Sequence, residues 1–369
     1  MGIARELAEL GSAYNSGGIN QFRNRIINGA MVIDQRNAGA SVTNTNAGIY
    51  SIDRWRLFGA QASKFTVQQN AGSVTPPAGF TNYLGVTSIS AYSVALGETF
   101  NISQFIEGFN VADLGWGTAN AQPVTLSFWV RSSLTGTFGG TIQNSNVSRS
   151  YPFSYTISAA NTWEQKSITI TGDTTGTWLT TNGLGIRVVF GLGVNNDVSG
   201  TAGVWSSTAY FSVTGATSVV GTNGATFYIT GVQLEKGSTA TSFDYRPYGT
   251  ELALCQRYYY KIQAEAATRQ LATTAYTIDT SAYRGHGGFP VTMRIRPTTL
   301  EQTGTAGDYT WYSPTGGAKA AASVPIFNPL TNEYSYCVSG STSTGNTAGQ
   351  AGQLYSSNTN AYLAWSAEL

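Results

Sequence analysis

The sequence predicts an all-β protein of two domains, a two-layer sandwich followed by a second and smaller sandwich, with a short helix at the N-terminus. Short segments of alternating apolar and polar residues recur between clusters of Gly, Asn, Ser and Thr. Charged residues make up 11% of the chain, against roughly 25% in average globular proteins, whereas the apolar fraction is 41%. The length of 369 residues exceeds one ordinary domain, which has on the order of 100 to 200 residues.

The first ten residues have the pattern of an amphipathic helix. Ile3, Leu7 and Leu10 fall on one face, and Gly11 offers a C-terminal stop. A helix this short is marginal alone in water, and the Gly- and Ser-rich stretch that follows is typical of a flexible link. We therefore expect residues 1–18 to attach the chain to a larger assembly or to copies of itself. A frayed terminus is the simpler alternative.

Residues 19–248 have the pattern of antiparallel strands with one face exposed to water. The clearest strand is 124–131, because its alternate residues are apolar and would share one face. These residues are Val124, Leu126, Phe128 and Val130. Further strands are expected at 64–68, 163–171, 185–190 and 226–234.

A second domain is expected at 249–369. A short helix with Thr250 as its cap, Glu251 in its first turn and Cys255 on its apolar face marks the boundary. Strand-like runs follow at 270–278, 289–295, 309–312, 334–338 and 361–365.

Composition argues against several classes of partner. The net charge of +1 gives no strong field for a phosphate backbone or an anionic membrane surface, so neither nucleic acid nor membrane insertion is expected. No segment approaches the roughly 20 apolar residues of a membrane span. Glu6 and Glu9 interrupt the stretch where a secretory signal would need apolar residues.

The residue inventory also limits the chemistry. One histidine, His286, cannot build a His-rich zinc site, and neither Cys255 nor Cys337 has a second thiol at metal spacing. Both cysteines are expected to be free and buried, and no metal or other cofactor is expected. No nucleotide-binding or serine-hydrolase motif occurs. Glycoside cleavage needs only two carboxylates, so the motif search leaves it open.

A set of short motifs runs from residue 28 to the end of the chain. They read Asn-Gly-Ala-Met-Val-Ile-Asp-Gln-Arg at 28–36, Asp-Arg-Trp at 53–55, Val-Gln-Leu-Glu-Lys-Gly-Ser at 232–238, Phe-Asp-Tyr-Arg-Pro-Tyr at 243–248 and Glu-Leu-Ala-Leu-Cys-Gln-Arg-Tyr-Tyr at 251–259. They resemble a domain found in tail-fibre and other structural proteins of tailed bacteriophages. Phe-Pro-Val-Thr-Met-Arg at 289–294 and the final Ser-Ala-Glu-Leu are similar to a short domain often attached to it.

This resemblance covers most of residues 20–369. It implies a jelly-roll sandwich similar to carbohydrate-binding modules, carried by a virion protein that is commonly a homotrimer. It implies no catalytic residues, because none of the matching motifs is a catalytic one. It leaves the position on the virion open, since such modules occur on tail fibres, head fibres and capsid decorations.

Sugar recognition needs flat apolar faces next to planar polar groups, so aromatic residues in polar surroundings are the candidates for glycan binding. They are Tyr309, Trp311 and Tyr312 at the rim of a distal loop, Trp178 and Trp205 in loops of the first sandwich, and His286 in a glycine-rich loop. For each of them, a place in the core or in a plain loop is the alternative.

Several other residues have a structural interpretation. Trp55 is expected in the core, with Asp53 and Arg54 paired beside it, and Glu235 is expected to pair with Arg246. Arg257, next to Tyr258, stacks on tyrosines or lies at a subunit interface, and the sequence leaves both open. Turn residues Asp173, Asn195, Asn196 and Asp197 could supply calcium ligands, although ordinary Asx turns are the simpler explanation.

These observations predict a virion fibre protein that binds host-surface glycan as a homotrimer and contacts other virion proteins through its N-terminus. No catalysis is expected. Two alternatives remain: a decoration or head-fibre protein that binds no glycan, and a polysaccharide depolymerase that uses two carboxylates.

Overall fold

The computed structural model describes residues 23–343 and 345–369. Strands make up nearly all of their regular structure, and the α-helix within them is α2 (Tyr248–Gln256). No helix in the described residues is long and apolar enough to cross a membrane. The predicted helix at 1–10, with Ile3, Leu7 and Leu10, lies outside the described residues.

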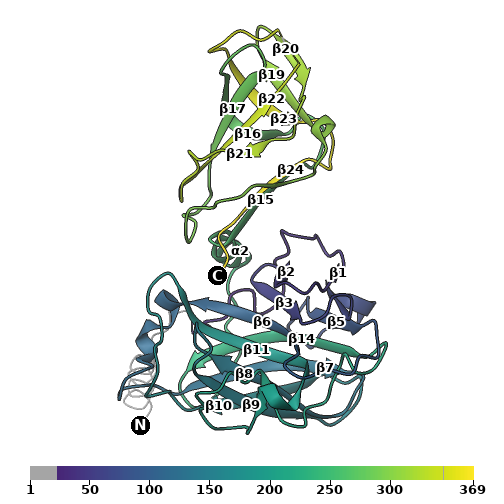
Figure 1. Cartoon of the computed structure of the whole chain (residues 1–369), viewed down its shortest axis with the longest axis vertical. Coiled ribbons are helices and arrows are strands. Elements are labelled where there is room, and N and C mark those ends of the chain that lie inside the picture. The colour runs from purple at the N-terminus through teal and green to yellow at the C-terminus, as the bar shows by residue number, and fades with distance from the viewer. Residues whose placement is uncertain (1–22, 344) are drawn as a thin grey trace, which may run out of the picture.

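The first domain is a jelly-roll sandwich of two six-stranded antiparallel sheets (Figure 1). Sheet 1 has the order β1 (Val42–Thr43), β4 (Phe65–Gln69), β5 (Leu84–Ser88), β14 (Thr226–Lys236), β7 (Val124–Ser132) and β10 (Glu164–Ile170). Sheet 2 has the order β2 (Ile49–Ile52), β3 (Trp55–Gly59), β6 (Thr99–Glu107), β11 (Leu184–Val194), β8 (Gly136–Gln143) and β9 (Ser150–Ile157). A parallel pair of β12 (Ser199–Gly200) and β13 (Ser212–Val213) lies outside them.

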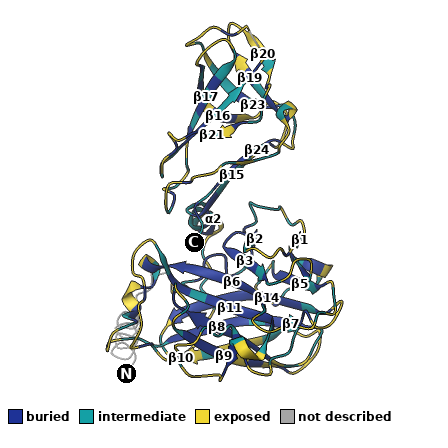
Figure 2. Cartoon of the chain, in the orientation of Figure 1, coloured by how far each residue is buried: buried dark blue, intermediate teal, exposed yellow. Residues whose placement is uncertain are grey.

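Alternation along the strands produces the core of this domain. The predicted apolar face of β7 is confirmed, since Val124, Leu126, Phe128 and Val130 are all buried. The ring of Phe128 meets that of Phe190 from sheet 2 edge to face, with centroids 5.1 Å apart. Figure 2 shows the buried residues concentrated along the strands of the two sheets.

The second domain is built from two smaller sheets. A seven-stranded sheet has the order β20 (Gly317–Ala320), β19 (Tyr309–Ser313), β23 (Ala351–Ser356), β16 (Gln270–Thr277), β17 (Ala282–Gly288), β22 (Ser335–Ser341) and β21 (Ile326–Phe327). A three-stranded sheet has the order β15 (Tyr259–Gln263), β24 (Tyr362–Ser366) and β18 (Glu301–Gln302). Short 3₁₀ turns lie at Ala71–Ser73, Gly108–Asn110, Ala112–Leu114, Asn196–Val198 and Ala306–Asp308.

One strand of the second domain was predicted in the wrong place. Residues 289–295 form no strand, whereas the glycine-rich segment expected to be a loop is β17. The reason is packing. A Cβ at Gly285 would press on the Ala272 side chain, and one at Gly287 would overlap the Tyr336 ring. These glycines therefore allow close approach inside a strand and mark no turn.

Glu368, just after the last strand of the second domain, binds two arginines of the first domain. Its carboxylate pairs with Arg36 at 2.9 Å and with Arg54; the Arg54 side chain is buried, and those of Arg36 and Glu368 are largely shielded from water. The predicted pair of Asp53 with Arg54 is therefore wrong. Asp53 instead accepts hydrogen bonds from the backbone and side-chain nitrogens of Gln35, at 2.6 and 2.7 Å.

A second contact between the domains is made by Glu107, at the end of β6 in the first domain. Its carboxylate accepts hydrogen bonds of 2.6 Å from the Arg257 guanidinium and from the Tyr258 hydroxyl. The Arg54 guanidinium also lies over the Tyr258 ring, with its Cζ 3.6 Å from the ring centroid. Arg257 and Tyr258 thus join the two domains within one chain. A contact of either residue with another subunit stays a prediction.

Arg246 holds α2 against the first domain, although its partner differs from the predicted one. It pairs with Glu251 in the first turn of the helix, at 3.2 Å. Glu235 lies elsewhere and accepts hydrogen bonds from Thr241. Both carboxylates are buried, and each finds its partner close by in the chain.

The buried carboxyl of Asp53 is expected to make stability depend on pH. Burial raises its pKa from 3.8 to about 6, against the opposing effects of Arg36 and Gln35. The folded state therefore holds this proton more tightly than the unfolded state, so stability falls as the pH rises from about 4 to about 6, by at most about 3 kcal/mol.

The measurement is urea denaturation between pH 4 and 7 of the wild type and of Asp53→Asn. Subtracting the two curves removes the contributions of the other carboxylates. The wild type should lose stability relative to the variant as the pH rises through this window. A flat difference would show that Asp53 has an ordinary pKa.

Candidate functional site

The strongest sequence candidates for sugar binding lie in the core of the second domain. Tyr309 and Trp311 are fully buried on the inner face of β19, and Trp311 stacks on Tyr283 with centroids 5.3 Å apart. They cannot present a ring to a ligand, so their assignment as contact residues is wrong. The third candidate, Tyr312, points outward, is 37% exposed and stacks on Tyr355.

Trp178 and Trp205 are brought together by the fold, with Trp116 as a third ring. The three indoles meet edge to face at centroid distances of 4.7 to 5.6 Å. Each indole N–H already donates to a backbone carbonyl. Trp116 and Trp178 are buried and belong to the sandwich core, and Trp205 is half-buried against it. The cluster packs the sandwich and leaves little aromatic face for a sugar.

His286 lies on the outer face of β17. Its ring is parallel to that of Tyr276, and its Nε2 is 3.7 Å from the Sγ of Cys337. Burial raises the pKa of the Cys337 thiol to about 11, so the thiol is neutral at physiological pH. Both cysteines are free and buried, as predicted.

The turn residues considered as calcium ligands have partners within the protein. Asp173 forms a bidentate pair with Arg149, at 2.7 and 2.8 Å. Asn195 caps a 3₁₀ turn by accepting from the backbone of Asp197. No group of three or more His, Cys, Asp or Glu side chains suitable for a metal ion occurs among residues 23–343 and 345–369.

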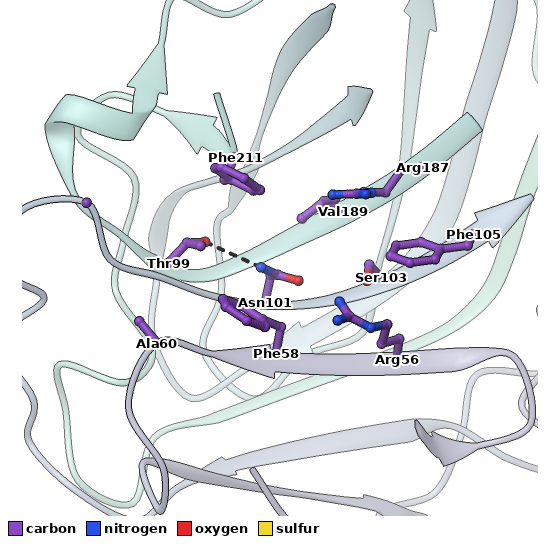
Figure 3. Close-up of a pocket in the computed structure, with 11 residues that line it drawn as sticks. Arg56, Phe58, Ala60, Thr99, Asn101, Ser103, Phe105, Arg187, Val189 and Phe211 are labelled. Carbon is purple, nitrogen blue, oxygen red and sulfur yellow. Dashed lines mark hydrogen bonds between the residues drawn. The ribbon is translucent and has the colours of Figure 1, made fainter. Parts of the chain in front are cut away.

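A cavity of about 400 Å³ opens on the outer face of sheet 2, which we call the groove (Figure 3). Its volume lies within the range of roughly 300 to 1,000 Å³ that is typical of small-molecule sites. It is lined by Arg56, Phe58, Ala60, Gly97, Thr99, Asn101, Ser103, Phe105, Arg187, Val189 and Phe211.

Strand alternation and register build the groove. In β3, Trp55 and Leu57 point into the core, so Arg56 and Phe58 point outward. On β6, Asn101 pairs with Phe58, and Ser103 pairs with Arg56. On the other side of β6, β11 adds Val189 beside Ser103 and Arg187 beside Phe105. The central strand thus forms the floor, and its two neighbours form the walls.

Phe211 closes the groove from above, because two glycines let its segment lie close to sheet 2. A Cβ at Gly139 would overlap the side chains of Ser212 and Val213, and a Cβ at Gly191 would press on Ser212. In Figure 3, Phe211 and Phe58 lie on opposite sides of Asn101.

The floor of the groove carries polar side chains. Asn101 donates from Nδ2 to the Thr99 hydroxyl at 3.3 Å, and its Oδ1 takes part in no hydrogen bond within the described chain. The Ser103 hydroxyl is buried and also lacks a hydrogen-bond partner there. A ligand or an ordered water in the groove can donate a hydrogen bond to the free Asn101 oxygen.

At one end of the groove, Arg56 and Arg187 both approach the Phe105 ring, with their Cζ atoms 5.2 and 4.7 Å from its centroid. Burial, and then repulsion from Arg56, lowers the pKa of Arg187 to about 10. Burial also lowers the pKa of Arg56. Both guanidinium groups remain cationic at neutral pH.

Sequence reasoning missed the groove. Phe58 is not among the predicted glycan contacts, and no strand is predicted at 99–107. The available signal was the alternation Thr-Phe-Asn-Ile-Ser at 99–103, which places polar residues on one face of a strand.

No protein-family model and no curated protein matches the sequence. Among solved structures, similarity is found to the enzymatically active domain of tailspike protein 4 of bacteriophage CBA120, at 12% identity and a TM-score of 0.30. It covers 58% of this chain and 21% of that one. A putative sugar binding protein from Bacteroides thetaiotaomicron is similar at 12% identity and a TM-score of 0.35, over 58% of this chain and all of that one.

A family 11 carbohydrate-binding module from Clostridium thermocellum, in complex with a mixed-linked tetrasaccharide, is similar at 9% identity and a TM-score of 0.27. It covers 55% of this chain and 100% of that one. At these identities and scores, the likeness carries no weight for function. The all-β sandwich architecture described above follows from the strand order and register of this chain itself.

Proposed function

We propose that this chain is a glycan-binding protein of a bacteriophage virion, and that the groove on sheet 2 is its glycan site. The observation that carries the proposal is the combination of Phe58 and Phe211 on either side of a floor that includes Asn101. Aromatic rings suit the C–H faces of a pyranose, and amide and hydroxyl groups suit its hydroxyl edge.

The proposed role of the groove is binding without cleavage. Glycoside hydrolysis by the usual route needs two carboxyl groups on either side of the scissile bond. The described residues that line the groove are arginines, aromatic residues, small residues and neutral polar residues. They suit the holding of a sugar chain, and the proposal therefore assigns adhesion to this surface.

The virion location and the homotrimer belong to the same proposal, and they are supported by the resemblance of the motifs at 28–36, 243–248 and 251–259 to phage structural proteins. Residues 1–18 would attach the chain to other virion proteins. Three grooves on one particle-bound trimer would convert a weak single-site affinity into firm attachment through multivalency. Sedimentation of the purified chain tests the trimer directly.

Phe58→Ala is expected to weaken glycan binding about tenfold, because the sugar loses one of its two aromatic walls. A glycan array identifies the ligand, and titration calorimetry then measures the affinity of both proteins for it. The control is Phe109→Ala, which removes a phenylalanine that is 60% exposed outside the groove and should leave the affinity unchanged.

Two results would contradict the proposal. If Phe58→Ala and the wild type bound the glycan equally well, the glycan site would lie outside the groove. A wild-type chain that binds no glycan on the array would instead favour a structural decoration or head-fibre protein.

A further inference from the structure

Two arginines converge at one end of the groove from different strands. Arg56 comes from β3 and Arg187 from β11, on opposite sides of Ser103 in β6 (Figure 3). Both guanidinium groups lie against the ring of Phe105. Two like charges therefore share one half-buried corner.

This pair has no counter-ion in the described part of the chain. Several buried or half-buried arginines of this protein are neutralised, since ion pairs are formed by Arg36, Arg54, Arg149, Arg246 and Arg257. Among residues 23–343 and 345–369, no carboxylate forms an ion pair with Arg56 or Arg187. The Nε of Arg187 is buried and has no hydrogen-bond partner there.

Such an arrangement costs folding free energy. Burial penalises each charge, and the mutual repulsion adds to that penalty. Charged residues are scarce in this chain, so two unpaired arginines at one place are unusual for it. Uncompensated charge in a cavity is typical of a site whose ligand supplies the opposite charge.

We propose that the groove takes an anionic glycan, with a carboxylate or phosphate group between Arg56 and Arg187 and the sugar rings extending toward Phe58 and Phe211. This inference rests on the proposed glycan site and names its ligand class. A guanidinium matches both anions because its planar fork donates two parallel hydrogen bonds to them.

The first experiment compares acidic and neutral glycans on the array. We expect wild-type binding to acidic glycans and a loss of at least about tenfold in affinity for Arg56→Gln and Arg187→Gln. The affinity of the wild type should also fall as salt is added. The matched control is Arg131→Gln, because Arg131 lies on sheet 1, stacks on Tyr228 and donates to the Asn161 carbonyl.

Glutamine keeps part of the aliphatic stem and removes the charge. Since repulsion disappears in these variants, their melting temperatures should equal or exceed that of the wild type. A drop in affinity without a drop in melting temperature would therefore reflect the lost charge and not misfolding.

Gly48→Ala tests whether the position of the charge matters. A Cβ at Gly48 would overlap the Arg56 guanidinium, so this variant displaces the charge without removing it. Displacement should weaken binding of an acidic glycan nearly as much as Arg56→Gln does. Full affinity in Gly48→Ala would show that only the net charge attracts the ligand, which would contradict a positioned anion site.

The second experiment needs no array ligand. Glucose, glucuronate and glucose 6-phosphate are titrated while the arginine Nε–Hε signals are followed by NMR. We expect glucuronate, glucose 6-phosphate or both to shift the signals of Arg56 and Arg187, and glucose to leave them in place. The two acidic probes distinguish a carboxylate ligand from a phosphate ligand.

Failure of this inference differs from failure of the proposed function. Binding to neutral glycans that is unchanged in both glutamine variants would overturn the anionic ligand and leave the glycan site intact. An empty array with shifted arginine signals would overturn adhesion and keep the anion site. An empty array without shifts would overturn both.

Discussion

Replacing Glu107 with alanine is expected to destabilise the protein by about 3 kcal/mol and to loosen the second domain from the first. The Glu107 side chain is 1% exposed and accepts hydrogen bonds from Arg257 and Tyr258. Removing one partner of a buried pair costs about 3 to 5 kcal/mol, because the other charge is left buried without a partner. We expect the lower value, since the Arg257 side chain is 31% exposed and can reach water.

Calorimetry and urea denaturation measure this loss, and hydrogen exchange in α2 reports the loosening. The matched control is Asp113→Ala, which breaks a pair with Arg25 whose side chains are 46% and 23% exposed and should cost less than about 1 kcal/mol. Glu107→Gln keeps an acceptor for the Tyr258 hydroxyl and should fall between the two. If Glu107→Ala were as harmless as Asp113→Ala, the carboxylate would not join the domains.

Trp311→Ala is expected to destabilise the second domain by about 3 to 5 kcal/mol, as is typical when a large aromatic core side chain is removed. The ring is fully buried, stacks on Tyr283 and fills the space above Gly352, where a Cβ would overlap it. Calorimetry should show a lower melting temperature for this domain. The affinity of the first domain for its glycan should remain unchanged.

The neighbouring residue offers a matched control for this substitution. Tyr312 lies on the other face of the same strand, 37% exposed, and stacks on Tyr355. Tyr312→Ala should therefore cost about 1 kcal/mol or less. The buried position would be contradicted if Trp311→Ala lost glycan binding and kept its melting temperature. That result would indicate that Trp311 is exposed and contacts the glycan.

Strand prediction succeeded where alternation was clean and failed where glycine had another use. The face of β7 was predicted correctly because four alternate apolar residues are visible without knowledge of any neighbour. The glycines around His286 resemble turn residues and therefore predict a loop. Only the side chains of Ala272 and Tyr336, from neighbouring strands, explain why glycine is needed within β17.

The candidate site shows the same division. Exposed aromatic residues were sought by composition, and the richest run, at 309–312, supplied two core rings. The groove depends instead on Arg56, Asn101 and Arg187, which meet only when β6 pairs with both β3 and β11. The spacing of these three residues along the sequence does not predict that they lie close together.

The sequence by itself determined that the chain is all-β, that a short helix follows the first domain, and that both cysteines are free and buried. These properties are local, because alternation and residue inventory depend on neighbouring positions. The predicted cap is wrong, since the helix begins at Tyr248 after Pro247 and Thr250 lies within its first turn. Tertiary structure alone decided which strands lie side by side, which glycines permit close packing, and which arginines come together without a counter-ion. Those properties depend on pairing between distant segments, since register places the side chains of one strand beside those of another.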